Sequence, residues 1–341
     1  MQEKISFIEV AGQPYDRGYQ AGQFFREILS KKLVKYQERL KDLSLYRQMK
    51  KIEPKVAQVF PDYHQEVLGR ADGAKVDRDL YFLLMCPELI NEGVGCTTII
   101  YRKPDGAYLL SHNEDDVYEP GNACLTKCQL EKGWFVTYDY SNMPFGNAFS
   151  WNSSGIVKTI NYCFPPEENL TGIPRYFLQR HITEASSLQD FIQRCQIPDR
   201  ASGYHAVALD IRRNKAVSVE VTASCLSVEE IGDFYLHTNH YLHPKICQNQ
   251  VWQGEGSTSG FRLEKATNLL KARLENSSPP LSLDNLKKIL EYRGNGYEDS
   301  ILAIQGEPNF TCANISLDTT LEEGIWLDFY STGEQLRLAY F

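Results

Sequence analysis

Long apolar runs are missing from this sequence. The densest of them, such as Tyr81 to Cys86, are far too short to cross a bilayer, and the opening segment MQEKISFIEV has no basic stretch followed by an apolar one. Clustered basic residues are missing as well: 36 Lys and Arg stand against 44 Asp and Glu, for a net charge of −8 spread along the chain. We therefore expect a cytoplasmic protein that has neither a membrane nor a nucleic acid as a partner.

A regular cysteine framework is also lacking. The chain has nine cysteines, an odd number at irregular spacing. Such a pattern is typical of reduced thiols in a cytosol and argues against disulfides.

The overall amino-acid composition is that of a globular protein. Of the 341 residues, 42% are hydrophobic and 23% are charged, with many Tyr and Phe. This length suffices for one large domain or two ordinary ones, with a sizeable core and an enclosed pocket.

The first ninety or so residues have helical patterning. Apolar residues recur at three- and four-residue steps from Asp16, a plausible N-cap, to Leu43, which predicts one long amphipathic helix. Further helices are predicted from about Pro61 to Arg70, stopping before Asp72-Gly73, and from Arg78 to about Ile90. Residues 1–95 are thus expected to form a helical N-terminal segment.

After Gly95 the patterning changes to short β-branched and aromatic runs. Strands are predicted at 97–101, 107–110, 134–138, 156–160, 204–211, 216–221, 234–237, 311–317, 324–329 and 335–340, with helices at 174–195, 261–274 and 283–292. Strand blocks separated by helices indicate an α+β protein with two sheets and helices outside them. Residues 96–341 are expected to be one domain, because no long linker divides them.

The stretch Gly93-Val-Gly-Cys-Thr-Thr98 stands where helix gives way to strand. A glycine carbonyl is the least hindered one that an adjacent thiol could attack, so Cys96 sulfur and the Gly95 carbonyl could form a thioester. Its hydrolysis would release residues 1–95 and expose the amine of Cys96, which has an ordinary pKa near roughly 8 and can act as base for its own thiol. The alternative is a buried core cysteine, the commoner fate of a free thiol.

Several motifs in order resemble the acyl-coenzyme A:isopenicillin N acyltransferase family of Ntn hydrolases and the related choloylglycine hydrolases. The resemblance runs from Gly95 almost to the C-terminus. Its motifs are Gly95-Cys96-Thr97-Thr98 as a cleavage site, Asp105-Gly106 with His112-Asn113-Glu114-Asp115 as a hairpin whose Asn-x-Asp faces the nucleophile, Trp151 to Ile156, His237-Thr238-Asn239-His240, and Ser257 to Arg262.

This resemblance implies a four-layer α-β-β-α Ntn-hydrolase sandwich and a set of functional residues. Cys96 would be the nucleophile, Asp115 the carboxylate that orients its amine, and Asn239 an oxyanion donor. Asn152 and Arg262 are further catalytic candidates, and Thr97, Asn113 and His240 are candidates for substrate binding. The residues themselves leave alternatives open: Asp115 in a solvated acidic turn, Asn152 holding a turn before Gly155, and Arg262 in a surface ion pair.

The histidines His237, His240 and His243 invite a zinc site, since zinc accepts three imidazoles. A strand followed by Pro244 makes a helix that would gather these rings improbable, and strand residues 237 and 240 would point apart. Cys124 and Cys128 do not indicate a metal site, because no second cysteine pair accompanies them. The glycines of 254–260 lack the lysine of a phosphate-binding loop, so they predict only a loop near the pocket. We expect neither a metal nor a cofactor.

The resulting prediction is a zymogen that cuts itself between Gly95 and Cys96 into two pieces that stay associated. Its activity would be hydrolysis of a linear amide of a small molecule through a thioester acyl-enzyme. Acyl transfer from an amide or an acyl-thioester of coenzyme A to an amine is one alternative. A non-catalytic small-molecule binder, a metal-dependent hydrolase built on His237, and assembly as a homo-oligomer stay open.

Overall fold

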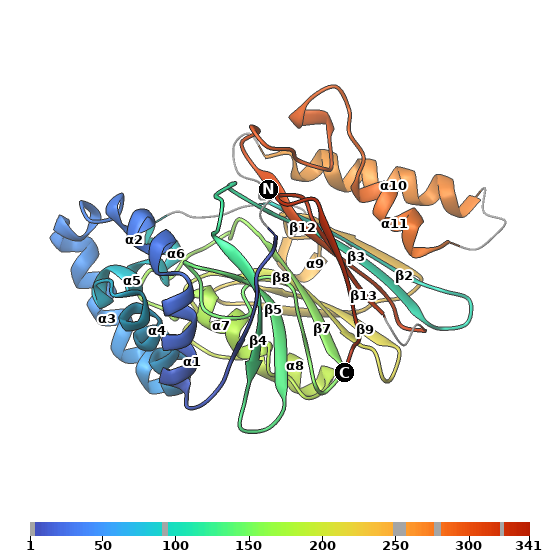
Figure 1. Ribbon diagram of the computed structural model, residues 1–341. Coiled ribbons are helices and arrows are strands. Elements are labelled where there is room, and N and C mark those ends of the chain that lie inside the picture. The colour runs from blue at the N-terminus through green and yellow to red at the C-terminus, as the bar shows by residue number, and fades with distance from the viewer. Residues whose placement is uncertain (1–3, 91–94, 248–256, 276–280, 321–323) are drawn as a thin grey trace.

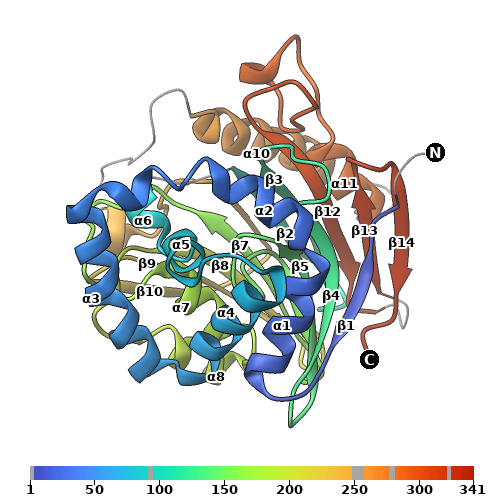
Figure 2. The same ribbon diagram turned by 60° about the vertical axis from the view of Figure 1, so that its left-hand side comes forward.

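The computed structural model describes residues 4–90, 95–247, 257–275, 281–320 and 324–341. Two β-sheets lie face to face, and helices cover the outer side of each (Figures 1 and 2). This arrangement confirms the four-layer α-β-β-α fold. No helix in these ranges is long and apolar enough to span a membrane. Of the predicted loop at 254–260, residues 254–256 lie outside the described residues, and the last two residues already belong to a helix that begins at Ser259.

The larger sheet has eight strands in the order β1-β4-β5-β6-β7-β8-β9-β10. They are β1 (Phe7–Val10), β4 (Ala123–Gln129), β5 (Trp134–Tyr140), β6 (Ser150–Asn152), β7 (Ile156–Tyr162), β8 (Tyr204–Asp210), β9 (Lys215–Val221) and β10 (Leu226–Glu230). Successive neighbours are antiparallel except β1 and β4, which run parallel.

The smaller sheet has six strands in the order β11-β2-β3-β12-β13-β14, all antiparallel. They are β2 (Cys96–Arg102), β3 (Tyr108–Asp116), β11 (Phe234–His237), β12 (Phe310–Asp318), β13 (Ile325–Phe329) and β14 (Glu334–Leu338).

Helices form the two outer layers. The eight-stranded sheet is covered by α1 (Pro14–Phe24), α2 (Arg26–Val34), α3 (Leu43–Val59), α4 (Pro61–Ala74), α5 (Arg78–Leu84), α6 (Pro87–Ile90), α7 (Arg175–Ile182) and α8 (Leu188–Arg194). The six-stranded sheet is covered by α10 (Ser259–Glu275) and α11 (Leu283–Leu290), and the short α9 (Pro244–Cys247) follows β11.

Three apolar cores lie between the four layers. Phe82, Phe177 and Val219 belong to the core between the first helices and the larger sheet. Leu110, Val207 and Ile315 belong to the core between the sheets, and Ile99, Leu270 and Leu286 to the core under α10 and α11. Strands such as β8 read as nearly continuous apolar runs because both of their faces are buried.

Helices α1 and α4 approach each other unusually closely. A Cβ added to Gly18 would lie 1.9 Å from the backbone oxygen of Glu66, and one added to Gly73 would lie 2.1 Å from that of Tyr19. The prediction that a helix stops before Asp72-Gly73 is therefore wrong. Gly73 lies inside α4 because the helix packing leaves no room for a side chain there.

The single helix predicted from Asp16 to Leu43 is also wrong. The chain forms α1, α2 and a 3₁₀ turn at Arg39–Lys41 before α3 begins. Asp42 caps α3 by accepting hydrogen bonds from the amides of Ser44 and Leu45, and this cap ends the earlier helical run. The apolar spacing continues across the breaks because successive helices bury the same side.

Strands β1, β4, β6 and β10 are elements that the sequence did not predict. Of these, β1 belongs to the N-terminal segment and pairs with β4 from Phe7–Leu125 to Val10–Cys128. The segment 1–95 is thus not purely helical, because it supplies an edge strand to the larger sheet.

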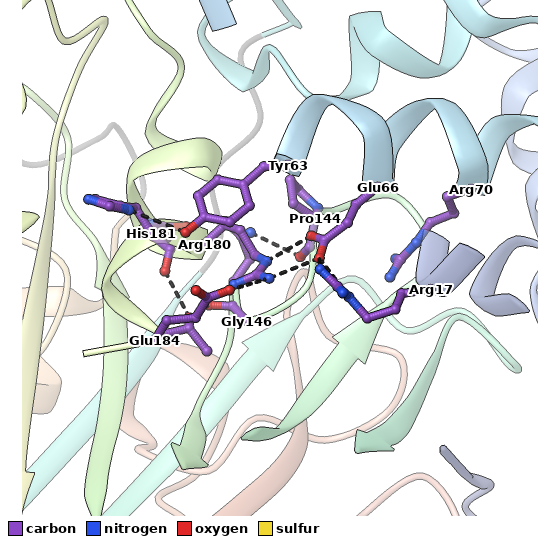
Figure 3. Close-up of polar contacts among 12 residues, drawn as sticks. Arg17, Tyr63, Glu66, Arg70, Pro144, Gly146, Arg180, His181 and Glu184 are labelled. Atoms are coloured by element: carbon purple, nitrogen blue, oxygen red, sulfur yellow. Dashed lines mark hydrogen bonds and ion pairs between the residues drawn. The ribbon is translucent and has the colours of Figure 1, made fainter. Parts of the chain in front are cut away.

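A buried ion-pair network joins the N-terminal helices to α7 (Figure 3). Glu66 of α4 accepts hydrogen bonds from Arg17 of α1 and Arg180 of α7, both at 2.9 Å. One turn further along α4, Arg70 bonds Asp139 of β5 at 3.0 Å. These side chains are all buried, so the charges are neutralised by one another instead of by water.

Candidate active site

Cys96 is the first residue of β2 and lies directly opposite Glu114 of β3. Side chains alternate along a strand, so those of Cys96 and Thr98 face the larger sheet, where Thr98 donates to Asn161 of β7 at 2.9 Å. Thr97 faces the opposite way and accepts a hydrogen bond from Arg262 of α10 at 2.7 Å. The peptide bond between Gly95 and Cys96 therefore has two distinct surroundings, one on each face of the sheet.

On the outer face, three predicted site residues meet at Gly95. A Cβ placed on Gly95 would lie 3.2 Å from Arg262 Nη2, 3.4 Å from Asp115 Oδ2 and 3.5 Å from Asn239 Oδ1. Gly95 is thus surrounded by a carboxylate from β3, a guanidinium from α10 and an amide from the turn after β11.

Hydrogen bonds fix the backbone on both sides of the Gly95–Cys96 bond. The amide of Asp115 donates to the Gly95 carbonyl at 3.0 Å, and the amide of Cys96 donates to Asn239 Oδ1 at 3.0 Å. Arg262 donates to the Cys96 carbonyl at 2.7 Å and to Asn239 Oδ1 at 2.5 Å. Asn239 Nδ2 donates to the carbonyl of Tyr162 at 2.9 Å, so in the uncut chain this amide serves Cys96 as an acceptor.

Asp115 is held in place by β12. Its Oδ1 accepts a hydrogen bond from Thr311 Oγ1 at 2.7 Å, at a point where a bulge shifts the β12–β3 register between Thr311 and Ala313. Bulges of this kind re-aim side chains next to functional sites. Asp115 and Arg262 are both buried, which rules out the solvated turn and the surface ion pair considered from the sequence.

On the inner face, the Cys96 thiol has two neighbours that the sequence did not predict as site residues. The ligand atoms of Cys96, His112 and Glu114 all lie within 4.8 Å of one another. His112 Nε2 is 3.2 Å from Glu114 Oε2, and His112 Nδ1 is 2.8 Å from Thr98 Oγ1. Alternation along β3 was the available signal, because it puts 112 and 114 on the face opposite to Asn113 and Asp115.

Cys96, His112 and Glu114 are the only such group of three among the described residues that could hold a metal ion. Both ring nitrogens of His112 already contact protein partners, Thr98 and Glu114. His112 and Glu114 are therefore members of a hydrogen-bonded group beside the thiol. The histidines His237, His240 and His243 contact three different partners, namely Glu220, Ser259 and Ser218.

Burial dominates the electrostatics of the site. It raises the pKa of the Cys96 thiol well above its ordinary value, and the charges of Glu114 and Asp115 raise it further. Burial also raises the pKa of Glu114 to about 8 and that of Asp115 to about 7, while Arg262 opposes the second of these shifts. The thiol of the uncut chain is consequently protonated at neutral pH and needs a base before it can react.

A cavity of about 300 Å³ opens beside the thiol and is lined by Cys96, Glu114 and Asp116. Lys32, Lys35 and Tyr36 of the N-terminal segment also line it. The segment before the Gly95–Cys96 bond thus helps to build the space that a substrate would enter.

Three residues predicted from the sequence do not join this group. Asn152 uses its side chain to bond the backbone of Thr183, Ala185, Ser154 and Ile156, at the opposite end of β7 from Tyr162. Asn113 bonds Leu290 and Asn314, and His240 bonds Ser259. None of the three lines the cavity beside Cys96, and the role in a turn considered for Asn152 is the one its contacts fit.

Known proteins resemble this chain in sequence and in fold. Residues 101–322 match the sequence model of the family described as acyl-coenzyme A:6-aminopenicillanic acid acyl-transferase. The matched range contains Asp115, Asn239 and Arg262 and begins five residues after Cys96. A beta-alanyl-dopamine/carcinine hydrolase of Drosophila melanogaster is 25% identical in an alignment 220 residues long, which covers 55% of this chain and 56% of that protein.

The chain therefore spans just over half the length of this curated relative. A crystal structure of a mutant conjugated bile acid hydrolase from Clostridium perfringens shares the fold with a TM-score of 0.50, at 16% identity, over 72% of this chain and 92% of that one. Because the family match covers well over half of the residues, the chain belongs to the acyl-coenzyme A:6-aminopenicillanic acid acyl-transferase family.

Proposed function

We propose that this protein is a cysteine-dependent amidohydrolase that cuts its own chain between Gly95 and Cys96 and then uses the new N-terminal cysteine as its nucleophile. The meeting of Arg262, Asp115 and Asn239 at Gly95 is the observation that carries the proposal. Residues so far apart in the sequence and of these types have no packing reason to converge on one buried glycine.

The contacts around Gly95 suit attack of the thiol on its carbonyl. The Asp115 amide already donates to the Gly95 oxygen at 3.0 Å, which is where negative charge develops in a tetrahedral intermediate. Collapse of the intermediate forms a thioester and frees the nitrogen of Cys96, and water then releases residues 1–95.

The same contacts suit catalysis by the cut chain. The freed amine of Cys96 keeps Asn239 Oδ1 as its partner, and the Asp115 carboxylate lies beside Gly95 to stabilise the ammonium form. The amine takes the thiol proton, the sulfur attacks an amide of the substrate, and water later removes the acyl group. Once the Gly95 residue has left, Asn239 Nδ2 is the nearby amide that we assign to the oxyanion.

We assign residues 1–95 and 96–341 to two fragments that stay together after cleavage. The Glu66–Arg180 and Arg70–Asp139 ion pairs cross the cleavage point, and so does the β1–β4 pairing. Lys32, Lys35 and Tyr36 would then remain part of the substrate cavity.

The substrate class that we favour is a β-alanyl amide of an aromatic amine. The Drosophila relative is named for hydrolysis of such amides. The cavity holds the carboxylates of Asp116 and Glu119, to which we assign the ammonium of a β-alanyl group, although Glu119 also pairs with Lys32 of the cavity at 2.9 Å. The ring of Tyr36 offers a surface against which an aromatic amine can pack. Acyl transfer to an amine instead of water shares the same acyl-enzyme and is the second activity to assay.

The test compares the wild-type chain with Cys96→Ala by intact mass under denaturing conditions. By proportion of the 39.0 kDa chain, we expect fragments of about 11 and about 28 kDa from the wild type and a whole chain from the variant. Purified wild type should then release amine from carcinine. If the wild type stays whole like the variant, self-cleavage is overturned. If the wild type is cut but hydrolyses no amide or thioester, the proposed hydrolase activity is overturned.

A further inference from the structure

The uncut chain lacks the base that the mature site would use. Before cleavage, the nitrogen of Cys96 belongs to a peptide bond, and its hydrogen is donated to Asn239 Oδ1. An amide nitrogen has no basic lone pair, so it cannot take the thiol proton. Self-cleavage, if it occurs as proposed above, requires a different proton acceptor near the sulfur.

The described residues place one carboxyl group next to that sulfur. Glu114 is the direct cross-strand partner of Cys96, and side chains in such pairs lie about 4.5–5.5 Å apart at Cβ. Its carboxyl oxygen lies within 4.8 Å of the thiol, on the same face of the sheet. Asp115, the carboxylate expected from the family resemblance, lies on the other face.

His112 holds this carboxyl group in place. Its Nε2 contacts Glu114 at 3.2 Å, and its Nδ1 is anchored to Thr98, whose hydroxyl is in turn bonded to Asn161 of the larger sheet. On its other oxygen, Glu114 accepts a hydrogen bond from Tyr140 of β5 at 3.4 Å. Both oxygens are therefore fixed by groups from the two sheets.

We propose, as an extension of the proposed function, that Glu114 is the base that takes the Cys96 thiol proton during self-cleavage, and that His112 is the residue that positions it. The proton passes from sulfur to the Glu114 carboxylate while sulfur bonds to the Gly95 carbonyl carbon. When the C–N bond breaks, the leaving nitrogen of Cys96 takes up a proton, which Glu114 can return. Water then hydrolyses the thioester, so atoms and charges balance without a further reactant.

Thr98 donates its hydroxyl hydrogen to Asn161, so His112 Nδ1 donates to Thr98 and His112 Nε2 accepts from the protonated Glu114 carboxyl. The ionised form of Glu114 that acts as the base is therefore the minor form at neutral pH. Burial raises the pKa of Glu114 to about 8 and that of the Cys96 thiol well above its ordinary value. The ionised Glu114 is thus a stronger base than an exposed carboxylate, which lowers the cost of taking the thiol proton. Burial lowers the pKa of His112 to about 3, so its ring is neutral and a weak base. Other ionisable groups that act on Glu114 are Tyr140 of β5 and Lys158 of β7.

The experiment follows cleavage over time after cell-free synthesis of the full chain. General bases contribute about 10²- to 10⁴-fold, so Glu114→Gln should slow cleavage by at least about 100-fold and Glu114→Asp by less. In the wild type the rate should rise with pH up to about 8 as the carboxyl ionises, and Glu114→Gln should lose this dependence. His112→Gln should slow cleavage and shift the pH profile.

Glu220→Gln is the matched control, because Glu220 and His237 form a second buried Glu–His pair, at 3.0 Å, whereas among the described residues only Glu114 and His112 form a close group of ligand atoms with the thiol. It should cleave at the wild-type rate. If Glu114→Gln does not melt cooperatively, the pH profile of Glu114→Asp decides the matter. Cleavage of a folded Glu114→Gln at the wild-type rate would overturn the inference and leave the proposed function standing. Dependence of cleavage on added zinc would also overturn it, since Glu114 and His112 would then be serving a metal.

Discussion

The backbone amide of Asp115 donates to the carbonyl oxygen of Gly95 at 3.0 Å, across the start of the β2–β3 pair. Asp115 thus places both its main chain and its carboxylate beside Gly95, since Oδ2 lies 3.4 Å from a Cβ built on that residue. One strand position therefore both polarises the carbonyl and supplies charge for the amine that cleavage would release.

Replacing Gly95 with alanine should slow self-cleavage by about tenfold without unfolding the protein. The new methyl would lie 3.2 Å from Arg262 Nη2, so the guanidinium must shift by a few tenths of an ångström. Small displacements of reacting groups carry large penalties in rate. Intact-mass time courses measure the effect, and a Gly95→Ala chain that is cut as fast as the wild type would contradict it.

Arg262→Lys should retain much less than a tenth of the wild-type cleavage rate. Arg262 reaches the Cys96 carbonyl, Thr97 and Asn239 at once, which a single ammonium cannot do. The rate of fragment formation is the measurement. Arg273→Lys, at the far end of the same helix, is the control and should behave as the wild type.

Asn239→Asp should separate cleavage from turnover. The substitution keeps an oxygen acceptor for the Cys96 amide but removes the Nδ2 donor, so cleavage should be affected less than hydrolysis of substrate. Losing one oxyanion donor costs about 10²- to 10³-fold in kcat. Steady-state kinetics on the cut variant, normalised to the fraction of cut chains, would show the loss in kcat with a smaller change in KM. Equal losses in both steps would count against separate roles.

The stability that Glu114 adds relative to glutamine should fall as pH rises. Its folded pKa of about 8 is above the ordinary 4.5, so the folded chain holds a proton that the unfolded chain releases. The contribution is complete below pH 4.5 and is lost as pH rises through 8, at up to about 1.4 kcal/mol per pH unit. Denaturant unfolding of Cys96→Ala and of Cys96→Ala with Glu114→Gln, between pH 5 and 8, measures the difference. A difference that is constant with pH would show that Glu114 is ionised in the folded chain.

Glu66→Gln should destabilise the protein by about 3–5 kcal/mol, because two buried guanidinium groups would lose their shared carboxylate (Figure 3). Glu38→Gln removes one partner of the exposed Lys41–Glu38 pair and should change stability by less than about 1 kcal/mol. In cut chains, size-exclusion chromatography in mild denaturant should show earlier separation of the two fragments for Glu66→Gln than for Glu38→Gln. Identical separation would mean that the network does not hold the fragments together.

The sequence predicted the layers well because their apolar periodicity is strong. Helices at 259–275 and 283–290 and strands at 96–102 and 310–318 lie where the pattern predicted them. Strand β4 escaped prediction because Lys127 and Thr126 interrupt its alternation, and β1 did so because four residues carry little pattern. Gly73 misled the prediction because its reason for being glycine is the backbone of α1, which is distant in sequence.

The candidate site was predicted unevenly. Asp115, Asn239 and Arg262 were identified by resemblance, and the structure brings them together at Gly95. His112 and Glu114 stand in the same motif, but which of its alternating residues face the thiol depends on the β2–β3 register, which the motif does not state. Lys32 and Tyr36 could not be found from sequence, because only the packing of α2 and of the turn after it places them in the cavity.

The position of β1 at the edge of the larger sheet affects how the protein refolds before and after cleavage. While the chain is whole, β1 finds β4 by closing a loop of about 110 residues, a process that does not depend on protein concentration. Once the chain is cut after Gly95, a denatured sample must bring two separate molecules together, and the bare edge of β4 is open to pairing with other chains. The refolding yield of cut protein should then fall on dilution, whereas that of Cys96→Ala should stay constant. The intact chain can therefore reach the fold from the denatured state, and the cut protein keeps a fold that it acquired before cleavage.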